Sequence, residues 1–399
     1  MKFPFVHVLL FLIAVLFGVF LGYMAWEWMG NATPSTAPAA VVIQEQAGIP
    51  PVAEPEPPVP ISPAVLDEMP PVVLSPAPAS PVPEVKTDLK KTQFVVMAFD
   101  GSYDIEMWKK TRAFAAAEAL VGAPIHFTYF INAAYLLTPS NKDLYHPPRH
   151  EVGTSAISFA YNEKDVANRV EQMNLALSEG HEIGSHSVGH WDGTDWTQEE
   201  WTSELTQFNS FVDHVGENNH LEKEPLIRRQ LSIPAASIIG FRAPELGRGP
   251  PLWKALAALG FRYDTSRTTK SLAWPTKDED GLWSFPLSRI DYPGVDKPLL
   301  AMDYNFYFRQ TEAKDTLKKG TPEWQKAHDD MLNAYLTYFQ THADGERAPV
   351  YIGHHFSLWN DGAYWEALKD FATAVCGKPD VKCVSFKELA DNLDASSRK

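Results

Sequence analysis

Two histidines spaced four residues apart are the first candidates for chemistry. His186 and His190 lie in the segment GHEIGSHSVGH at positions 180–190. If one helical turn separates them, both imidazoles point at the same ion. Neutral imidazole is the commonest nitrogen ligand of Zn²⁺ in proteins. The spacing therefore favours a metal site, and the alternative is a pair of surface histidines on a loop rich in glycine and serine.

Other reactive side chains follow short apolar runs. Asp100 ends the run QFVVMAFD, Arg242 ends SIIGFR, and His354 and His355 end PVYIGHH. A guanidinium beside a carboxylate keeps the carboxylate ionised, so Arg242 could pair with Asp100. Successive residues of a strand face opposite sides, so only one of the tandem histidines can point into a site. Taken singly, each of these residues is also compatible with a structural role.

These side chains need elements that bring them together. Apolar, β-branched runs typical of buried strands alternate with segments typical of helices. We expect strands at 93–99, 124–131, 181–184, 237–242, 261–263 and 349–355, and helices at 107–120, 164–177, 252–259 and 324–339. This alternation predicts an α/β fold with a parallel sheet or barrel, whose strand ends meet at one face. We therefore expect Asp100, His186, Arg242 and His355 to share one site.

The N-terminal end of the chain has a different character. Residues 3–26 contain no Lys, Arg, Asp or Glu, and about 20 apolar residues suffice to span a bilayer as a helix. Trp26 and Trp28 fall where a membrane interface would lie. We predict a transmembrane signal anchor over residues 1–29, single-pass in a bacterial-type cytoplasmic membrane, with the rest of the chain outside the cytoplasm. A long signal peptide cleaved near Asn31 is the alternative.

A proline-rich segment follows this apolar stretch. Between Pro34 and Pro83 lie 15 of the 32 prolines of the chain. A segment of this composition cannot bury enough apolar area to fold and favours an extended chain. We predict a Pro-rich disordered linker over residues 30–92 and one catalytic domain over residues 93–399.

Charge and cysteine content exclude several classes of protein. The chain has 35 Lys and Arg against 50 Asp and Glu, a net charge of −15. Nucleic-acid binding needs a basic surface, so we predict no nucleic-acid partner. No GxSxG motif of a serine hydrolase is present in the sequence. Cys376 and Cys383 are too few for a disulfide-rich scaffold; outside the cytoplasm they could form one disulfide, and two free thiols are the alternative.

Taken in order, the motifs resemble those of the polysaccharide deacetylases, which carry the NodB-homology domain of carbohydrate esterase family 4. The resemblance covers roughly residues 93–392. The segment AFDGS at 98–102 resembles the first motif, usually TFDDG, and HSVGH at 186–190 resembles the second, His-Ser/Thr-x-x-His. The segment RAP at 242–244 resembles the third, Arg-x-Pro, whose arginine orients the catalytic base, and YIGHH at 351–355 resembles the last.

The resemblance implies a distorted (β/α) barrel of the NodB-homology type and a metal-dependent hydrolase. Its substrate would be an envelope or extracellular polysaccharide with N-acetylglucosamine-type sugars, from which it removes acetyl groups. His186 and His190 would bind a divalent metal, zinc in most members. Asp100 would deprotonate the attacking water. His355, or His354 if the register differs by one residue, would protonate the departing amine.

Two positions depart from the family pattern. The family's second aspartate, the third metal ligand, is Gly101 here. Asp104 could replace it, Asp100 could itself coordinate, a water could fill the position, or the metal could be weak or absent. For the aspartate that tunes the acid histidine, Asp264 is the nearest candidate and Asp303 the second.

Substrate contacts are expected from residues near the motifs. Pyranose faces pack well on aromatic rings, and the candidates are Trp191, Trp196, Trp283, Tyr304, Tyr307 and Trp359. Pro244 and Asp303 complete the predicted substrate contacts. The alternative for the aromatic residues is burial in the core.

Two other functions are compatible with the same motifs. A protein of the same fold could be catalytically impaired through Gly101 and retain only a carbohydrate-binding cleft. An amidase acting on non-sugar C–N bonds could use the same groups. Metal content separates the first of these from a deacetylase, and substrate screening separates the second.

Overall fold

A parallel sheet forms the centre of the molecule. The structure is a computed structural model that describes residues 87–270, 272–292 and 297–397. The predicted signal anchor and the linker up to residue 86 lie outside these residues. Within the described ranges, no helix is both long enough and apolar enough to cross a membrane.

The strands and helices alternate along most of the chain. The strands are β1 (Gln93–Gly101), β2 (Thr128–Ile131), β3 (Glu182–Ser185), β4 (Gly240–Phe241), β5 (Tyr263–Asp264), β6 (Thr268–Thr269), β7 (Trp283–Ser284), β8 (Leu287–Ile290), β9 (Leu299–Leu300), β10 (Val350–His355) and β11 (Val381–Cys383). The helices are α2 (Ile105–Leu120), α3 (Glu163–Ser178), α4 (Gln198–Asp213), α5 (Val215–Asn218), α6 (Leu226–Arg229), α7 (Pro250–Ala258), α8 (Asp303–Thr311), α9 (Pro322–Asp344), α10 (Trp359–Cys376) and α11 (Phe386–Ser397). Four 3₁₀ turns are η1 (Ala133–Leu136), η2 (Lys142–Leu144), η3 (Ala235–Ser237) and η4 (Pro244–Leu246).

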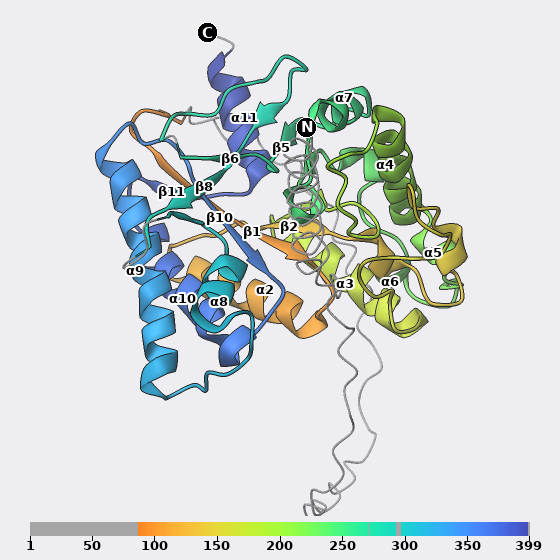
Figure 1. Cartoon of the computed structure of the whole chain (residues 1–399), viewed down its shortest axis with the longest axis horizontal. Coiled ribbons are helices and arrows are strands. Elements are labelled where there is room, and N and C mark those ends of the chain that lie inside the picture. Colours follow the sequence, from red (N-terminus) through yellow and green to blue (C-terminus); the bar gives the residue numbers. More distant parts are fainter. Residues whose placement is uncertain (1–86, 271, 293–296, 398–399) are drawn as a thin grey trace, which may run out of the picture. The chain divides into compact units, whose positions relative to one another are not determined.

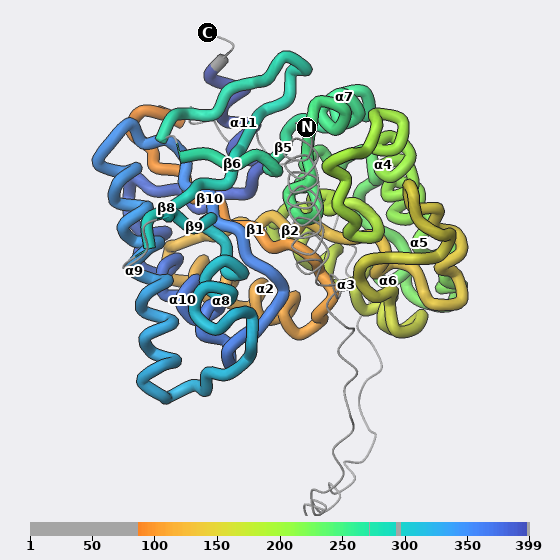
Figure 2. Tube along the Cα trace, in the orientation of Figure 1, coloured from red at the N-terminus to blue at the C-terminus, as the bar shows by residue number. Residues whose placement is uncertain are grey.

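The main sheet has the strand order β10-β1-β2-β3-β4-β5-β7, and every neighbouring pair is parallel. Helices α8, α9 and α10 lie on one flank, and α4, α5, α6 and α7 lie on the other (Figure 1). The chain trace in Figure 2 shows the late strand β10 returning beside the first strand β1. This half-barrel of parallel strands with surrounding helices confirms the predicted distorted (β/α) barrel.

Strand β1 divides the core because its side chains alternate between two faces. Phe94, Val96 and Ala98 pack in the cluster inside the barrel. Their neighbours Val95, Met97 and Phe99 pack in the larger cluster formed with the helices. Asp100 continues the inward-facing series at the carboxyl end of the strand.

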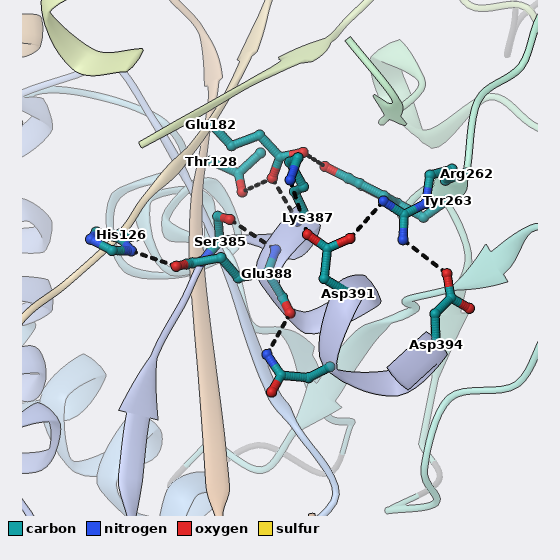
Figure 3. Close-up of polar contacts among 11 residues, drawn as sticks. His126, Thr128, Glu182, Arg262, Tyr263, Ser385, Lys387, Glu388, Asp391 and Asp394 are labelled. Carbon is teal, nitrogen blue, oxygen red and sulfur yellow. Dashed lines mark hydrogen bonds and ion pairs between the residues drawn. The ribbon is translucent and has the colours of Figure 1, made fainter. Parts of the chain in front are cut away.

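Helix α11 covers the opposite, amino-terminal end of the barrel. Phe386 and Leu389 of this helix are buried in the inner cluster. Hydrogen bonds also connect α11 and the sheet (Figure 3). The Glu182 carboxylate accepts from Thr128 Oγ1, from Tyr263 OH and from the Lys387 backbone N–H, each at 2.8 Å. The last helix therefore closes this end with both apolar and polar contacts.

Cys376 and Cys383 form a disulfide between the end of α10 and the end of β11. Their Cα atoms lie 5.6 Å apart, and both side chains are buried. The bond closes the short turn that leads from α10 into β11 and then into α11.

The expected elements differ from the structure at their ends, and the helices α8, α10 and α11 and the strands β6 to β9 and β11 were not expected. The strand expected at 124–131 begins only at Thr128, and the strand expected at 237–242 is reduced to β4, because residues 235–237 form the turn η3. Helix α4 was not expected, although Thr197 and Glu200 form a capping box at its start.

Candidate active site

A pocket opens at the carboxyl end of the barrel strands and encloses about 620 Å³. Asp100, His186, His190 and His355 line it, together with Tyr304 and Trp359. The volume falls in the usual range for small-ligand sites, roughly 300–1,000 Å³. The structure thus brings together residues from the ends of β1, β3 and β10.

Asp100 and Arg242 form a buried ion pair below this pocket. Arg242 Nη1 donates to Asp100 Oδ1 at 2.8 Å, and Arg242 Nε donates to Thr265 Oγ1 at 2.8 Å. The guanidinium is 0% exposed and lies 4.6 Å from the centre of the Phe130 ring. Such a pair fixes the orientation of the carboxylate, while Asp100 Oδ2 accepts from no protein group in the described part of the chain.

The two candidate ligands His186 and His190 lie with their ring centres 5.0 Å apart. They do not lie on a helical turn, which corrects that part of the prediction. The segment leaves β3 as a loop in which Ser187 has φ 65° and His190 has φ 59°. Left-handed backbone at these positions turns the second imidazole back toward the first.

Both imidazoles are held in the neutral state. Burial lowers the pKa of His186 to about 3 and also lowers the pKa of His190. His186 Nδ1 lies 2.7 Å from the carbonyl oxygen of Arg242. Because a carbonyl can only accept, Nδ1 carries the proton and Nε2 keeps its lone pair, the form in which imidazole binds a metal.

The donor chemistry of this pair fits a zinc-type ion. Two neutral imidazoles line one pocket, and a backbone carbonyl fixes the tautomer of one of them. Across residues 87–397, apart from the gaps at 271 and 293–296, no group of three or more His, Cys, Asp or Glu side chains is arranged to hold a metal. The pair supplies two candidate ligands, where catalytic zinc sites usually have three from the protein.

A buried glutamate supports the loop between the two histidines. Glu204 of α4 is 0% exposed, and its Oε1 accepts from Ser187 Oγ at 2.7 Å and from the Val188 N–H at 2.9 Å. The Tyr145 hydroxyl donates to both of its oxygens, at 3.0 and 2.9 Å. Glu204 was not among the residues predicted from the sequence. A capping box followed by an acidic residue on the apolar face of α4 was the one available indication.

His355 is paired with a buried aspartate. Its Nδ1 lies 2.6 Å from Asp303 Oδ1, and its backbone N–H donates to Asp303 Oδ2 at 2.9 Å. Burial alone would lower the pKa of His355, but the charge and hydrogen bond of Asp303 outweigh it, so the pKa is raised. Asp264, the first candidate for this partner, instead accepts from the Ser266 hydroxyl and N–H, and the second candidate, Asp303, holds the histidine.

His354 faces away from the pocket. Its side chain is 2% exposed, and its Nε2 lies 3.2 Å from the Tyr335 hydroxyl under helix α9. Burial lowers the pKa of His354 to about 4. On β10, Tyr351 faces the inner cluster and Ile352 the outer one, so His355 continues the inward series and His354 the outward one.

Aromatic rings form one wall beside His355. Trp359 lies 5.3 Å from the His355 ring and is stacked on Tyr307 at 4.7 Å. The Tyr304 ring centre is 5.7 Å from that of Trp359. Of the other predicted aromatics, Trp196 is buried in a third core cluster, and Trp191 is stacked on His150 at 3.6 Å.

Other predicted site residues also do not line the pocket, among them Asp303, which was predicted to contact the substrate. Trp283 is buried in the inner core and its indole N–H donates to Asp394 at 3.0 Å, so its predicted substrate contact is corrected. Asp104 caps α2 by accepting from the N–H groups of Glu106 and Met107 and does not line the pocket, which corrects its prediction as a metal ligand. Pro244 is buried at the start of η4 and does not line the pocket, although its neighbour Glu245 does.

Comparisons with known proteins give similarity of structure only. No protein-family model and no curated protein matches the chain. The chain is similar to a structure from Mycobacterium smegmatis assigned to the polysaccharide deacetylases, with 18% identity, a TM-score of 0.43, and coverage of 80% of this chain and 96% of that one. It is similar to the Xyl-CE4 domain of a multidomain xylanase from the hindgut metagenome of Trinervitermes trinervoides, with 11% identity, a TM-score of 0.39, and coverage of 76% and 92%.

A third similar structure is a family 4 carbohydrate esterase from Streptomyces lividans in complex with acetate. It has 12% identity and a TM-score of 0.37, with coverage of 73% of this chain and 91% of that one. With identities this low, the function of the present chain is inferred from its own pocket.

Proposed function

We propose that the protein is a polysaccharide deacetylase that hydrolyses N-acetyl groups on N-acetylglucosamine-type sugars. The observation that carries this proposal is the pairing of Asp100 with His355. The two residues are directly opposite in the register of β1 and β10 and line one pocket. One is a carboxylate fixed by a guanidinium, and the other is an imidazole whose pKa is raised by a carboxylate.

This arrangement supplies a base and an acid for breaking an amide bond. Asp100 Oδ2 takes a proton from the water that attacks the acetyl carbonyl carbon. His355 gives a proton to the nitrogen as the C–N bond breaks, so the products are acetate and a free amino sugar. Asp303 raises the pKa of His355 and fixes the orientation of its ring.

A divalent metal of the zinc type would be held by His186 and His190. When bound, such an ion polarises the carbonyl oxygen and lowers the pKa of its water. The Arg242 carbonyl orients His186 by accepting from its Nδ1. The Glu204 carboxylate holds the loop between the two histidines by accepting from the Ser187 hydroxyl.

The setting of the enzyme is also part of the proposal. The apolar residues 3–26 would anchor the chain in a bacterial-type cytoplasmic membrane, and the proline-rich linker would let the domain reach an envelope or extracellular polysaccharide. A catalytic domain outside the cytoplasm agrees with the disulfide between Cys376 and Cys383.

Acetate release from N-acetylated chito-oligosaccharides, measured with the full chain, tests the proposal. Asp100→Asn should lower turnover by about 10²- to 10⁴-fold, the usual contribution of a general base, and should keep its metal. Asp104→Asn is the matched control, because asparagine also caps a helix, and should retain full turnover. Undiminished activity in Asp100→Asn would overturn the assignment of the base.

Metal content measured in parallel identifies the ligands. Elemental analysis after dialysis with one equivalent of Zn²⁺ should find metal in the wild type and lose it in His186→Ala. A wild-type protein that binds the oligosaccharide, retains no metal and releases no acetate would instead support the carbohydrate-binding alternative.

A further inference from the structure

The ring of Phe130 lies beneath the guanidinium of Arg242. Phe130 belongs to β2, is fully buried, and stands opposite Asp100 of β1 in the register of the sheet. The centre of its ring is 4.6 Å from the guanidinium carbon of Arg242. A cation within about 6 Å of an aromatic ring is attracted by the negative charge of the ring face, most strongly where water is excluded. The buried pair is therefore held by an attraction that is separate from the hydrogen bonds of Arg242.

Those hydrogen bonds hold the guanidinium at only two of its three nitrogens. Nη1 of Arg242 donates to Asp100 Oδ1, and Nε donates to Thr265 Oγ1, each at 2.8 Å. Nη2 is buried and has no hydrogen-bond partner among the described residues. Burying a charged group is costly, and its donors are usually all satisfied. The attraction of the Phe130 ring offsets part of this cost and restrains a guanidinium that is incompletely hydrogen-bonded.

A glycine on the next strand makes room for this ring. Gly184 of β3 stands opposite Phe130 in the register of the sheet. A Cβ atom at position 184 would lie 2.6 Å from Phe130 Cδ1, which is closer than two carbon atoms can pack. Glycine within a strand often marks the close approach of another group. The Phe130 ring therefore occupies space that a side chain at position 184 would fill, and this places the ring beside Asp100.

We propose that Phe130 is a positioning residue of the reaction. Its ring holds the guanidinium of Arg242, and the guanidinium in turn holds the Asp100 carboxylate where it takes the proton from water. This inference rests on the proposed function, because it takes Asp100 as the base. A displacement of about 1 Å can lower a rate about 10²-fold. Phe130 and Arg242 do not line the pocket, so the ring acts on the chemical step and not on the binding of the sugar.

Fluorination of Phe130 in the full chain tests this contact while keeping the shape of the ring. Each fluorine withdraws electrons from the ring face, so phenylalanine analogues with one, two and three ring fluorines attract a cation less strongly at each step. We expect kcat for acetate release from N-acetylated chito-oligosaccharides to fall stepwise, by roughly five- to thirtyfold at three fluorines, with KM unchanged. A ring that only filled the core would show no such graded loss of kcat.

Phe94 is the matched control. It is a buried phenylalanine of β1 in the same inner cluster, and its ring packs at 6.4 Å from the ring of Trp274. The same analogues at position 94 should leave kcat unchanged. Phe130→Leu should lower kcat at least as much as three fluorines do, whereas Phe94→Leu should lower only the melting temperature. A kcat that stays constant along the Phe130 series, or falls equally along both series, would overturn the proposal.

An NMR measurement separates this inference from the proposed function. Exchange of the Arg242 Nε–H proton with water reports how firmly the guanidinium is held, whether or not the protein hydrolyses a sugar. Exchange should become faster along the Phe130 series and stay constant along the Phe94 series. If this is found and the wild type releases no acetate, Phe130 holds Arg242 and the deacetylase proposal fails. Unchanged exchange along the Phe130 series refutes the positioning role whatever the activity.

Discussion

Both ends of the barrel bury ionisable side chains, but the two ends differ in how fully these side chains are hydrogen-bonded. At the amino end, Glu182 accepts three hydrogen bonds and is covered by α11. At the carboxyl end, Arg242 Nη2 is buried and has no hydrogen-bond partner among the described residues, and Asp100 and His355 line an open pocket. The same kinds of residue thus stabilise the fold at one end and are available for reaction at the other.

Left-handed backbone is also found in the loops at the carboxyl end. The loops after β1, β3 and β4 contain non-glycine residues with positive φ, and these are Ser102 (104°), Ser187 (65°), His190 (59°), Glu245 (51°) and Leu246 (58°). Such conformations cost about 1–3 kcal/mol each and persist where surrounding contacts enforce them. Arg169 and Glu204 enforce two of these loops: Arg169 Nε donates to the Ser102 carbonyl at 3.0 Å, and Glu204 accepts from Ser187.

Replacing the acid at the reactive end should produce the largest effect. We expect His355→Ala to lower turnover by about 10²- to 10⁴-fold, and also to lower stability, because it leaves the buried Asp303 carboxylate without its ring partner. His354→Ala should keep most of its turnover and instead lower the melting temperature, because it opens a cavity under α9. Acetate release and thermal unfolding of the two variants check this, and equal turnover in both would remove β10 from the mechanism.

A smaller effect is expected from changing the partner of the acid. The Asp303 carboxylate raises the pKa of His355 against the effect of burial. His355 must be protonated to act, so activity should fall as the pH rises through this raised pKa. Asp303→Asn should therefore move the alkaline limb of the kcat profile to lower pH by roughly one unit.

Asp264→Asn is the control for this shift. Asp264 bonds to Ser266 and not to His355, so its replacement should leave the position of the alkaline limb where it is. A limb that moves equally in both variants would mean that Asp303 does not set the pKa of the acid.

The amino end should affect stability alone. Burial raises the pKa of Glu182 from 4.5 to about 7. Between these values the folded protein holds a proton that the unfolded chain releases, so the free energy of unfolding should fall as the pH rises, by up to roughly 3 kcal/mol. Glu182→Gln should remove this decline and leave kcat at its wild-type value.

Urea unfolding at several pH values between 4.5 and 7 measures this decline. Glu163→Gln, at an exposed glutamate of α3, is the control and should keep the wild-type slope. If the Glu182→Gln variant keeps the wild-type dependence of unfolding free energy on pH, Glu182 is not the titrating group. If this variant loses turnover, the two ends of the barrel are not independent.

Local pattern predicted the strands that carry the site, but not every contact between distant segments. The apolar runs before Asp100 and His355 are strands, as expected for short, continuously apolar segments that are buried on both faces. Asp303 was ranked below Asp264 because its approach depends on tertiary pairing. The segment before α8 pairs with β10 through a β-bridge between Met302 and Gly353. A contact between segments this far apart cannot be predicted from the spacing of residues in the sequence.

Two further differences also have a physical cause. His186 and His190 have the spacing of a helical pair, but glycine and serine allow the loop to turn back through left-handed backbone held by Glu204. Trp283 lies between the third and the last motif in the chain. Strand β7 nevertheless directs its side chain into the inner core beside α11, where the indole N–H donates to Asp394.

The pairing of Asp100 with His355 in neighbouring strands has a consequence for how this scaffold can change. Hydrogen-bonded strands are held about 4.7–4.9 Å apart by their backbones, so the ladder sets the distance between the strands that carry base and acid. The walls of the pocket, by contrast, come from loops and from α8. If the proposed function holds, exchanging or lengthening these loops should therefore change which acylated polymer the pocket accepts and leave the proposed base and acid in place.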